Sequence, residues 1–241
     1  MFLGEARTPR GLRLYAIGDV HGCDELLAAV HSSIEADLLR QPSDDYRVIH
    51  LGDYVDRGPA TRAVLDRAIR LKATDPEHFI FLGGNHEDLL LMFLNDPVEA
   101  RATFLRFGGI QTMRSYGVAV DNGQHLSDVM DLRDRFAAAL PDAHRDFMSA
   151  LPSFVRFGDF FFCHAGIRPG IPLDQQDAND LRWIREPFLS DESDHGVVVV
   201  HGHTPADRVE VRPNRINVDT GAVFTGRLTC LVLEGTGYRF L

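Results

Sequence analysis

Residues 12–22, with the sequence LRLYAIGDVHG, place a short apolar run directly before a cluster of glycine, aspartate and histidine. Short runs rich in branched and aromatic side chains are typical of strands buried in a sheet. The same order recurs where apolar runs at residues 46–51, 79–82, 160–163 and 197–200 end at GDYVDRG (52–58), GGNHE (83–87), HAG (164–166) and HGH (201–203). The sequence therefore predicts buried strands that each end at polar side chains.

Helical patterns lie between several of these strands. Apolar residues recur at helical spacing in residues 25–39 and 61–71, and a longer helical stretch covers about residues 87–151. That stretch has breaks near Pro97, at Gly108-Gly109 and at residues 121–123. After residue 203, strand signals at residues 209–212, 215–218, 228–233 and 238–240 suggest a meander. We expect an α/β fold in one domain, residues 1–241, with a helical insertion at about residues 97–150.

The composition limits the classes of protein to which the chain can belong. The 241 residues carry a net charge of −10, whereas a protein that binds a nucleic-acid duplex needs a basic face. The three cysteines are too few, and odd in number, for a secreted disulfide framework. We expect no transmembrane span and no signal peptide, because no apolar run has the required length. These features predict a cytoplasmic protein with neither a duplex nor a membrane as partner.

The polar clusters follow strands whose carboxyl ends are the usual place for ligands in open α/β sheets. Asp19 and His21 can direct a carboxylate oxygen and an imidazole nitrogen to one cation, although the same residues could form an Asx turn. Asn85 offers a carbonyl oxygen to a hard cation, and it could also cap a helix that has Glu87 in its first turn. The HAG and HGH clusters add imidazoles, which could equally be packed core residues.

The GDYVDRG cluster is the most informative of the five. Asp53 closes a predicted strand, and its carboxylate could bridge two cations. Arg57 could bind a phosphate through two parallel hydrogen bonds. The alternative is that Asp56 caps a helix and pairs with Arg57 at the surface. In the third cluster His86 adjoins Asn85 and is free to act as an acid or a base.

Taken together, the strand ends supply mixed nitrogen and oxygen ligands with one carboxylate suited to bridging. Such a set suits two divalent metals about 3.5–4 Å apart that activate water for in-line attack on phosphorus. The chain has no P-loop, no nucleophile-elbow serine and no Cys-x-x-Cys motif. These residues therefore favour metal-assisted hydrolysis of a phosphoester.

Three ordered motifs, GDVHG (18–22), GDYVDRG (52–58) and GNHE (84–87), resemble the signature motifs of the PPP-type metallophosphoesterases. The resemblance is strongest to the bacterial and phage lambda-type serine/threonine protein phosphatases. It extends through CHA (163–165), WIRE (183–186), GHTP (202–205) and DTGAVF (219–224), and so covers nearly the whole chain except about residues 97–150. It implies the calcineurin-like metallophosphoesterase fold, a central β-sandwich flanked by helices.

The resemblance also implies a role for each site residue. Two divalent metal ions are expected, with Mn²⁺ favoured and Fe or Zn as alternatives. The implied ligands are Asp19, His21 and bridging Asp53 for one metal, and Asp53, Asn85, His164 and His203 for the other. His86 corresponds to the general acid and Asp56 to the carboxylate that orients it. Arg57 and Arg185 correspond to the arginines that bind the substrate phosphate.

The implied activity is removal of phosphate from phosphoserine or phosphothreonine in proteins by direct attack of a metal-bridging water. The alternative is a symmetrical dinucleoside tetraphosphate hydrolase, a class that the stretch LTCL (228–231) also resembles. Those enzymes tend to lack an aspartate at the position of Asp56 and to carry Asp where Glu87 stands. The expected substrate is a phosphoprotein or a small phosphoester, and the oligomeric state stays open. A degenerate scaffold would lack a ligand, an acid or an arginine, and none is missing.

The remaining polar residues receive structural interpretations. We expect surface positions for His31, His78, His125, His144 and His195. His50 is expected to be packed, His201 to neighbour the site, and residues 219–224 to form a tight turn. The insertion either shapes the rim of the pocket or serves as structural cover.

Overall fold

The computed structural model describes residues 1–120 and 129–241. The strands are β1 (Leu12–Ile17), β2 (Asp45–His50), β3 (Phe79–Phe81), β4 (Phe154–Phe157), β5 (Phe160–Cys163), β6 (Val198–His201), β7 (Glu210–Val211), β8 (Arg215–Asn217), β9 (Cys230–Glu234) and β10 (Gly237–Phe240). The α-helices are α1 (Asp24–Arg40), α2 (Thr61–Thr74), α3 (Asn85–Asn95), α4 (Pro97–Phe104), α5 (Ile110–Ser115), α6 (Val129–Ala139), α7 (Asp142–Ser149), α8 (Ala178–Trp183) and α9 (Ala222–Thr225). A π-helical turn, η1 (Leu105–Gly109), joins α4 to α5, and 3₁₀ turns lie at η3 (Leu173–Gln175) and η4 (Phe188–Ser190).

The strands form two mixed five-stranded sheets, in the orders β10-β9-β1-β2-β3 and β4-β5-β6-β8-β7. In the first sheet β1, β2 and β3 are parallel, and in the second β5, β6 and β8 are parallel. Ile17 is in register with His50, and His50 is in register with Phe81. The three parallel strands of the first sheet therefore end at the same level, and the polar residues that follow them emerge together.

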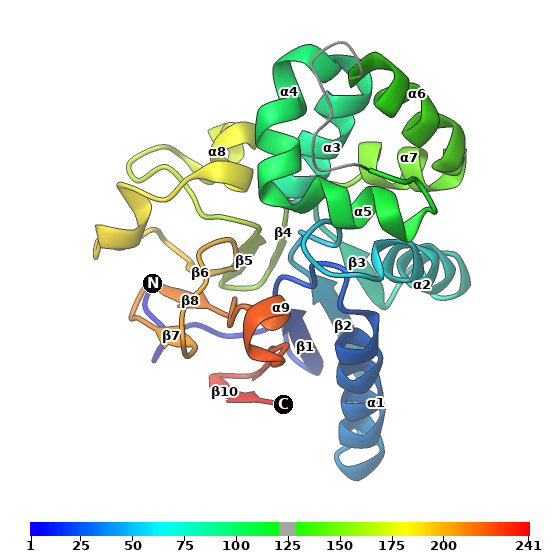
Figure 1. The fold of residues 1–241 in the computed structure, drawn as a ribbon. Coiled ribbons are helices and arrows are strands. Elements are labelled where there is room, and N and C mark those ends of the chain that lie inside the picture. The colour runs from blue at the N-terminus through cyan, green and yellow to red at the C-terminus, as the bar shows by residue number, and fades with distance from the viewer. Residues whose placement is uncertain (121–128) are drawn as a thin grey trace.

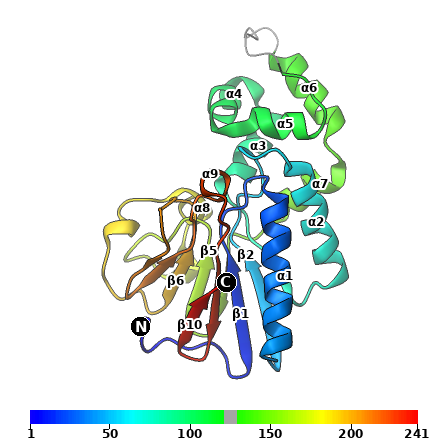
Figure 2. The same cartoon turned by 60° about the horizontal axis from the view of Figure 1, so that its bottom comes forward.

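Alternation along the strands explains the layers. Leu14 and Ala16 of β1 pack into a core between the two sheets with residues such as Phe160 and Phe162 of β5. Tyr15 points the other way, into the core under the helices. Figures 1 and 2 show α1 and α2 beside the first sheet, and α8 on the side of the second. The expected β-sandwich flanked by helices is confirmed.

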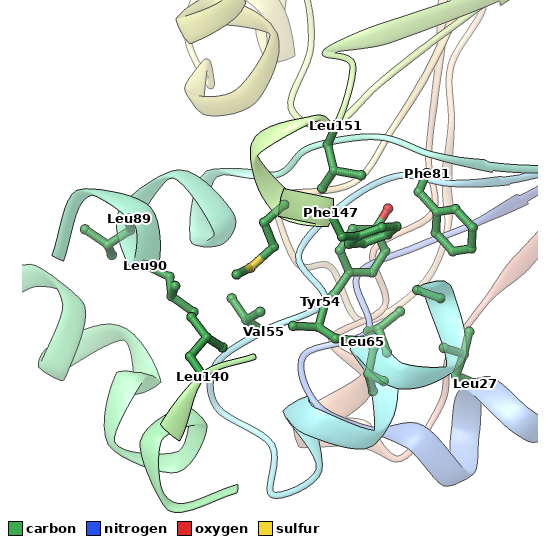
Figure 3. Close-up of a cluster of buried hydrophobic side chains, with 14 of the residues drawn as sticks. Leu27, Tyr54, Val55, Leu65, Phe81, Leu89, Leu90, Leu140, Phe147 and Leu151 are labelled. Atoms are coloured by element: carbon green, nitrogen blue, oxygen red, sulfur yellow. The ribbon is translucent and has the colours of Figure 1, made fainter. Parts of the chain in front are cut away.

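The helices α4 to α7 occupy the region predicted as an insertion and lie together at one end of the sandwich (Figure 1). Their buried side chains belong to the same cluster as those under α1 and α2. Figure 3 shows how this core reaches the GDYVDRG loop: Tyr54 and Val55 pack with Leu65 of α2, Leu90 of α3 and Phe147 of α7. This continuous core anchors the loop that carries Asp53 and Asp56.

Several expectations are wrong in detail. The C-terminal strands do not form one meander, because β7 and β8 pair in the second sheet whereas β9 and β10 return to the first. Strand β4 and helix α8 were not predicted. Pro97 does begin a new helix and Gly108-Gly109 does interrupt one, whereas the predicted break at residues 121–123 lies outside the described residues.

Two histidines expected at the surface are buried instead, and the side chain of a third, His195, is only 3% exposed. The His31 ring lies with its Nε2 2.9 Å from that of His50, and His144 lies between the hydroxyl of Tyr116 and the carboxylate of Asp66. Each finds its polar partner on a distant element, which a local pattern cannot indicate. His50 is buried as expected, and His125 lies outside the described residues. No helix in the described part of the chain is long and apolar enough to cross a membrane.

Candidate metal centre and active site

Polar residues that follow parallel strands of both sheets come together at one edge of the sandwich. The residues concerned are Asp19 and His21 after β1, Asp53 after β2, Asn85 at the start of α3, His164 after β5 and His203 after β6; all are buried. The ligand atoms of Asp19, Asp53 and His164 all lie within 4.8 Å of one another, and so do those of His21, Asp53 and His86. Four of the six predicted metal ligands, Asp19, His21, Asp53 and His164, therefore lie around one small volume, and His86 lies with them.

Asp53 stands at the centre of this group. Its Oδ2 lies 3.4 Å from Nε2 of His21, and its Oδ1 lies 3.3 Å from Nε2 of His164. One oxygen thus faces each predicted metal position, as a bridging carboxylate requires. Burial opposes ionisation of Asp53, but the imidazoles of His164 and His86 outweigh it and hold the pKa of this carboxyl well below its usual range.

Two of the three predicted histidine ligands, His21 and His164, are oriented as metal-binding histidines usually are. Nδ1 of His21 lies 2.8 Å from the carbonyl oxygen of Val55, and Nδ1 of His164 lies 2.9 Å from that of Leu51. Backbone carbonyls that accept from one ring nitrogen leave the other as a free lone pair for a metal. Burial lowers the pKa of His21 to about 3, which favours the neutral ring that a metal needs.

His203 and Asn85 complete the second side of the group. Oδ1 of Asn85 lies 2.9 Å from Nε2 of His164 and 2.8 Å from Nδ1 of His203. The backbone N–H of His203 donates to the carboxylate of Asp19, 3.1 Å from Oδ2. Nε2 of His203 is buried without a hydrogen-bond partner among the described residues. This set of oxygen and nitrogen donors fits hard or borderline divalent cations.

The backbone of the site is strained in one consistent way. Among the described residues, the non-glycine residues with positive φ are His21 (43°), Asp53 (53°), Asp56 (69°), Arg57 (65°) and His203 (66°). Each such conformation costs about 1–3 kcal/mol and persists only where the surrounding structure imposes it. All five residues belong to the predicted site, so the strain coincides with it. The concentration of strain is an indication of function independent of the motifs.

Two glycines allow the loops to approach so closely. A Cβ on Gly84 would collide with Oδ1 of Asp53, and one on Gly202 would collide with Oδ1 of Asp19. Both glycines precede a predicted ligand, so the two carboxylates can lie directly against the neighbouring loop.

Asp56 and His86 form a buried pair beside the ligands. Nδ1 of His86 lies 2.7 Å from Oδ2 of Asp56, and Oδ1 of Asp56 accepts from the hydroxyl of Thr112 at 2.7 Å. The same Thr112 oxygen accepts from the backbone N–H of Asp56 at 2.8 Å. Burial lowers the pKa of His86, but the carboxylates of Asp53 and Asp56 outweigh it and raise the pKa above its ordinary value. Asp56 is thus held by two elements and does not cap a helix.

The two predicted phosphate-binding arginines line one cleft of about 450 Å³ beside the ligands. The guanidinium of Arg57 has one nitrogen 2.7 Å from Nε2 of His21 and another 3.0 Å from Nε2 of His86. Arg185 is exposed on the loop after α8, and His203 lines the same cleft. Asp56 and Arg57 do not pair at the surface.

Glu87 has a role that the sequence showed only in part. It lies in the first turn of α3 as expected, but Gly84, not Asn85, is the N-cap. The carboxylate of Glu87 accepts from the backbone N–H groups of Asp53 (2.9 Å), Tyr54 (2.7 Å) and Gly84 (2.9 Å). Burial raises the pKa of Glu87 to about 7. This carboxylate therefore fastens the Asp53 loop to the start of α3.

Two further residues lie at the site although the sequence analysis assigned neither of them a role there. Thr112 comes from α5, in a stretch where only helical periodicity was visible. Asp219, in the expected turn, accepts from the backbone N–H of Gly221 at 2.9 Å, and with burial its charge raises the pKa of Asp19 well above its usual range. Asp219 lay in a recognised motif, so that motif was the available signal.

A two-sheet α/β fold with buried carboxylates, imidazoles and an amide at its strand ends defines a metallophosphoesterase. The chain belongs to the calcineurin-like phosphoesterase family, whose model matches residues 12–226. It is accordingly a hydrolase, and the family depends on divalent metals.

Two bacterial relatives are identical to this chain at about a quarter of the aligned positions. A protein of Oceanobacillus iheyensis is 25% identical over 248 residues, covering 95% of this chain and 89% of its own. One of Anoxybacillus flavithermus is 26% identical over 235 residues, covering 89% and 88%. Both are named bis(5′-nucleosyl)-tetraphosphatase PrpE, asymmetrical.

Solved structures support the fold. A putative diadenosine tetraphosphatase superposes with a TM-score of 0.67 at 20% identity, covering 98% of this chain and 97% of its own. A protein serine/threonine phosphatase from Saccharomyces cerevisiae superposes with a TM-score of 0.54 at 14% identity, covering 92% and 72%.

Proposed function

We propose that this chain hydrolyses dinucleoside tetraphosphates at the site centred on Asp53. The observation that carries the substrate class is the shared name of relatives that align with 89–95% of the chain. It favours the alternative raised by the sequence over the phosphoprotein phosphatase expected first. The names of those relatives specify asymmetrical cleavage, whereas the sequence suggested the symmetrical mode. We therefore propose cleavage into ATP and AMP for diadenosine tetraphosphate.

The proposed metal ligands follow from the geometry around Asp53. Asp19, His21 and Asp53 would hold one divalent ion, and Asp53, Asn85, His164 and His203 would hold the other. When bound, such a pair lowers the pKa of a coordinated water and neutralises charge on the phosphate oxygens. Glu87 supports this arrangement because it fixes the backbone on both sides of the bridging carboxylate.

The arginines would bind the phosphate that reacts. Arg57 carries two nitrogens directed toward the interior of the site, which matches the spacing of two phosphate oxygens. Arg185 would contact the same phosphate from another loop that lines the cleft. Together they would hold the phosphorus in line with the attacking water and exclude competing orientations.

His86 would supply a proton to the departing oxygen. Asp56 accepts from Nδ1 and so directs Nε2 toward Asp53 and the cleft. The carboxylates of Asp53 and Asp56 raise the pKa of His86, and a proton on Nε2 is the one that would be transferred.

One observation favours a second function, removal of phosphate from phosphoserine or phosphothreonine. A serine alkoxide is a poor leaving group and needs a general acid, whereas a departing nucleotide phosphate is already weakly basic. The 2.7 Å His86–Asp56 pair is therefore more useful against an alkyl phosphate than against a tetraphosphate.

Parallel assays separate the two functions. The metal-free protein is reconstituted with Mn²⁺ and assayed on diadenosine tetraphosphate, on a phosphoserine and phosphothreonine peptide panel, and on p-nitrophenyl phosphate. We expect the highest kcat/KM on diadenosine tetraphosphate, and equal amounts of ATP and AMP by ion-exchange chromatography. Peptide turnover without tetraphosphate turnover would overturn the proposal, and two molecules of ADP would overturn the asymmetrical mode. Full activity in excess chelator would reject the metal requirement.

A further inference from the structure

The cleft beside the predicted ligands carries three groups that the chemistry at phosphorus does not need. Arg106 and Phe107 lie on η1, and Phe224 lies on α9. Three arginines and no carboxylate line the cleft, although the whole chain has a net charge of −10. This local excess of positive charge exceeds what one phosphate requires and suits a longer anionic chain.

The two phenylalanines are unusually exposed for large apolar side chains. Phe107 is 41% exposed and Phe224 is 73% exposed. Both rings line the same cleft instead of packing into the adjacent cores. Aromatic rings exposed beside a cationic groove form the stacking surfaces with which proteins bind nucleobases.

Each ring lies next to one of the groups assigned to the reacting phosphate. The centre of the Phe224 ring is 6.0 Å from Cζ of Arg57, and the ring of Phe107 is 6.1 Å from that of His86 at an interplanar angle of 85°. Arg57 and His86 are themselves within 3.0 Å. Both rings therefore lie beside the Arg57–His86 pair, Phe224 next to Arg57 and Phe107 next to His86.

The backbone fixes Phe107 relative to that pair. Gly108, the next residue, has a φ of 111°, and its carbonyl oxygen accepts from the backbone N–H of Arg57 at 3.3 Å. A Cβ on Gly108 would collide with that nitrogen. The π-helical turn is thus pressed against the GDYVDRG loop, and the ring on it is held in position near Arg57.

We propose that Phe107 and Phe224 stack the nucleobases of the substrate and that Arg106 pairs with a phosphate beyond the one that reacts. This inference rests on the proposed function, since it assumes a substrate with a base at each end of a polyphosphate chain. Arg106 lies with its Cζ 5.9 Å from the centre of the Phe107 ring, so the cation and the stacking surface form one unit. A base on Phe107 would bring its own phosphates to Arg106.

The test compares Phe107→Ala, Phe224→Ala and the double variant on two substrates. The measured quantity is the ratio of kcat/KM for diadenosine tetraphosphate to that for p-nitrophenyl phosphate, which has no nucleobase. Loss of the stacking between one base and an aromatic ring weakens binding about 10-fold or more. We expect the ratio to fall about 10-fold for each single variant and further for the double variant. Phe240→Ala is the control, because Phe240 on β10 is 39% exposed, close to the value for Phe107, and lies outside the cleft; this variant should keep the ratio.

Binding of ATP and AMP, measured by calorimetry, gives a readout independent of turnover. Arg106→Gln should weaken ATP binding more than AMP binding, because only ATP reaches beyond the first phosphate. Phe107→Leu separates stacking from apolar cover, since leucine retains volume but has no π-face; we expect it to behave like Phe107→Ala.

The outcomes distinguish this inference from the proposed function. If the wild type cleaves diadenosine tetraphosphate and the folded double variant keeps the wild-type ratio, the stacking role is wrong. If the wild type cleaves only p-nitrophenyl phosphate or phosphopeptides, the proposed function is wrong, and ATP binding then decides the stacking role. Unchanged ATP affinity in the double variant, or a loss of phosphopeptide kcat/KM alone, would overturn the inference.

Discussion

The strand-end loops and the helices α4 to α7 contribute to the site in different ways. The loops carry the predicted ligands on strained backbone that buried contacts hold from several sides. Helix α5 contributes Thr112, whose side chain among the described residues hydrogen-bonds to Asp56 and Thr61 and to no predicted metal ligand. The turn η1 between α4 and α5 contributes Arg106 and Phe107, which line the cleft. We infer that the loops determine whether a phosphoester is cleaved, whereas the helices determine which one. Substitutions in the two regions should therefore have unequal effects.

The largest effect is expected from Asp53→Asn. The amide keeps the volume but removes the charge that faces both His21 and His164. Loss of a bridging ligand removes several kcal/mol of transition-state stabilisation, so kcat should fall about 10³-fold. Metal content, measured by mass spectrometry, should fall with it. Asp142→Asn, on the exposed start of α7, is the matched control; a metal-replete, active Asp53→Asn protein would contradict the bridging role.

His86→Asn should separate chemistry from metal binding within the loops. Loss of a general acid costs about 10²-fold in kcat or more when the leaving group is a poor one. We therefore expect the loss on an alkyl phosphate to exceed that on diadenosine tetraphosphate, while both metals stay bound. Equal losses on the two substrates would argue that His86 acts on the phosphate itself and not on the leaving oxygen.

Asp56→Asn tests the partner of that acid through pH. The Asp56 carboxylate helps to raise the pKa of His86, so its removal should lower that pKa. An acid with a lower pKa loses its proton at lower pH, and the alkaline limb of the pH profile of kcat should move to lower pH. We expect a loss in kcat of about 10-fold at neutral pH. A limb that stays in place would show that His86 titrates independently of Asp56.

The contrast between the regions also explains what the sequence could predict. Asp53 and His164 were candidates because Asp53 comes two residues after an apolar run and His164 directly after one, and parallel strands bring their ends together. The motif resemblance then identified both as ligands. Thr112 reaches Asp56 across 56 residues, and nothing local marks that contact. The same limitation made the surface assignments of His31 and His144 wrong, since their partners lie on other elements. Local sequence patterns predict where strands end, but they do not predict which helix residue contacts which loop residue.

Thr112→Val gives the smallest effect and the sharpest test of the contrast, because it changes a helix residue that supports a loop residue. Valine fills the same space but leaves both Oδ1 and the N–H of buried Asp56 without a partner. Each unpaired buried group costs about 1–3 kcal/mol, so the free energy of unfolding should fall by about 2–6 kcal/mol. We expect kcat to fall only a few-fold, because Asp56 still accepts from His86. Thr112→Ser keeps the hydroxyl and should restore both quantities. A loss in kcat as large as that of Asp56→Asn would mean that the helices take part in the chemistry and would remove the division between the two regions.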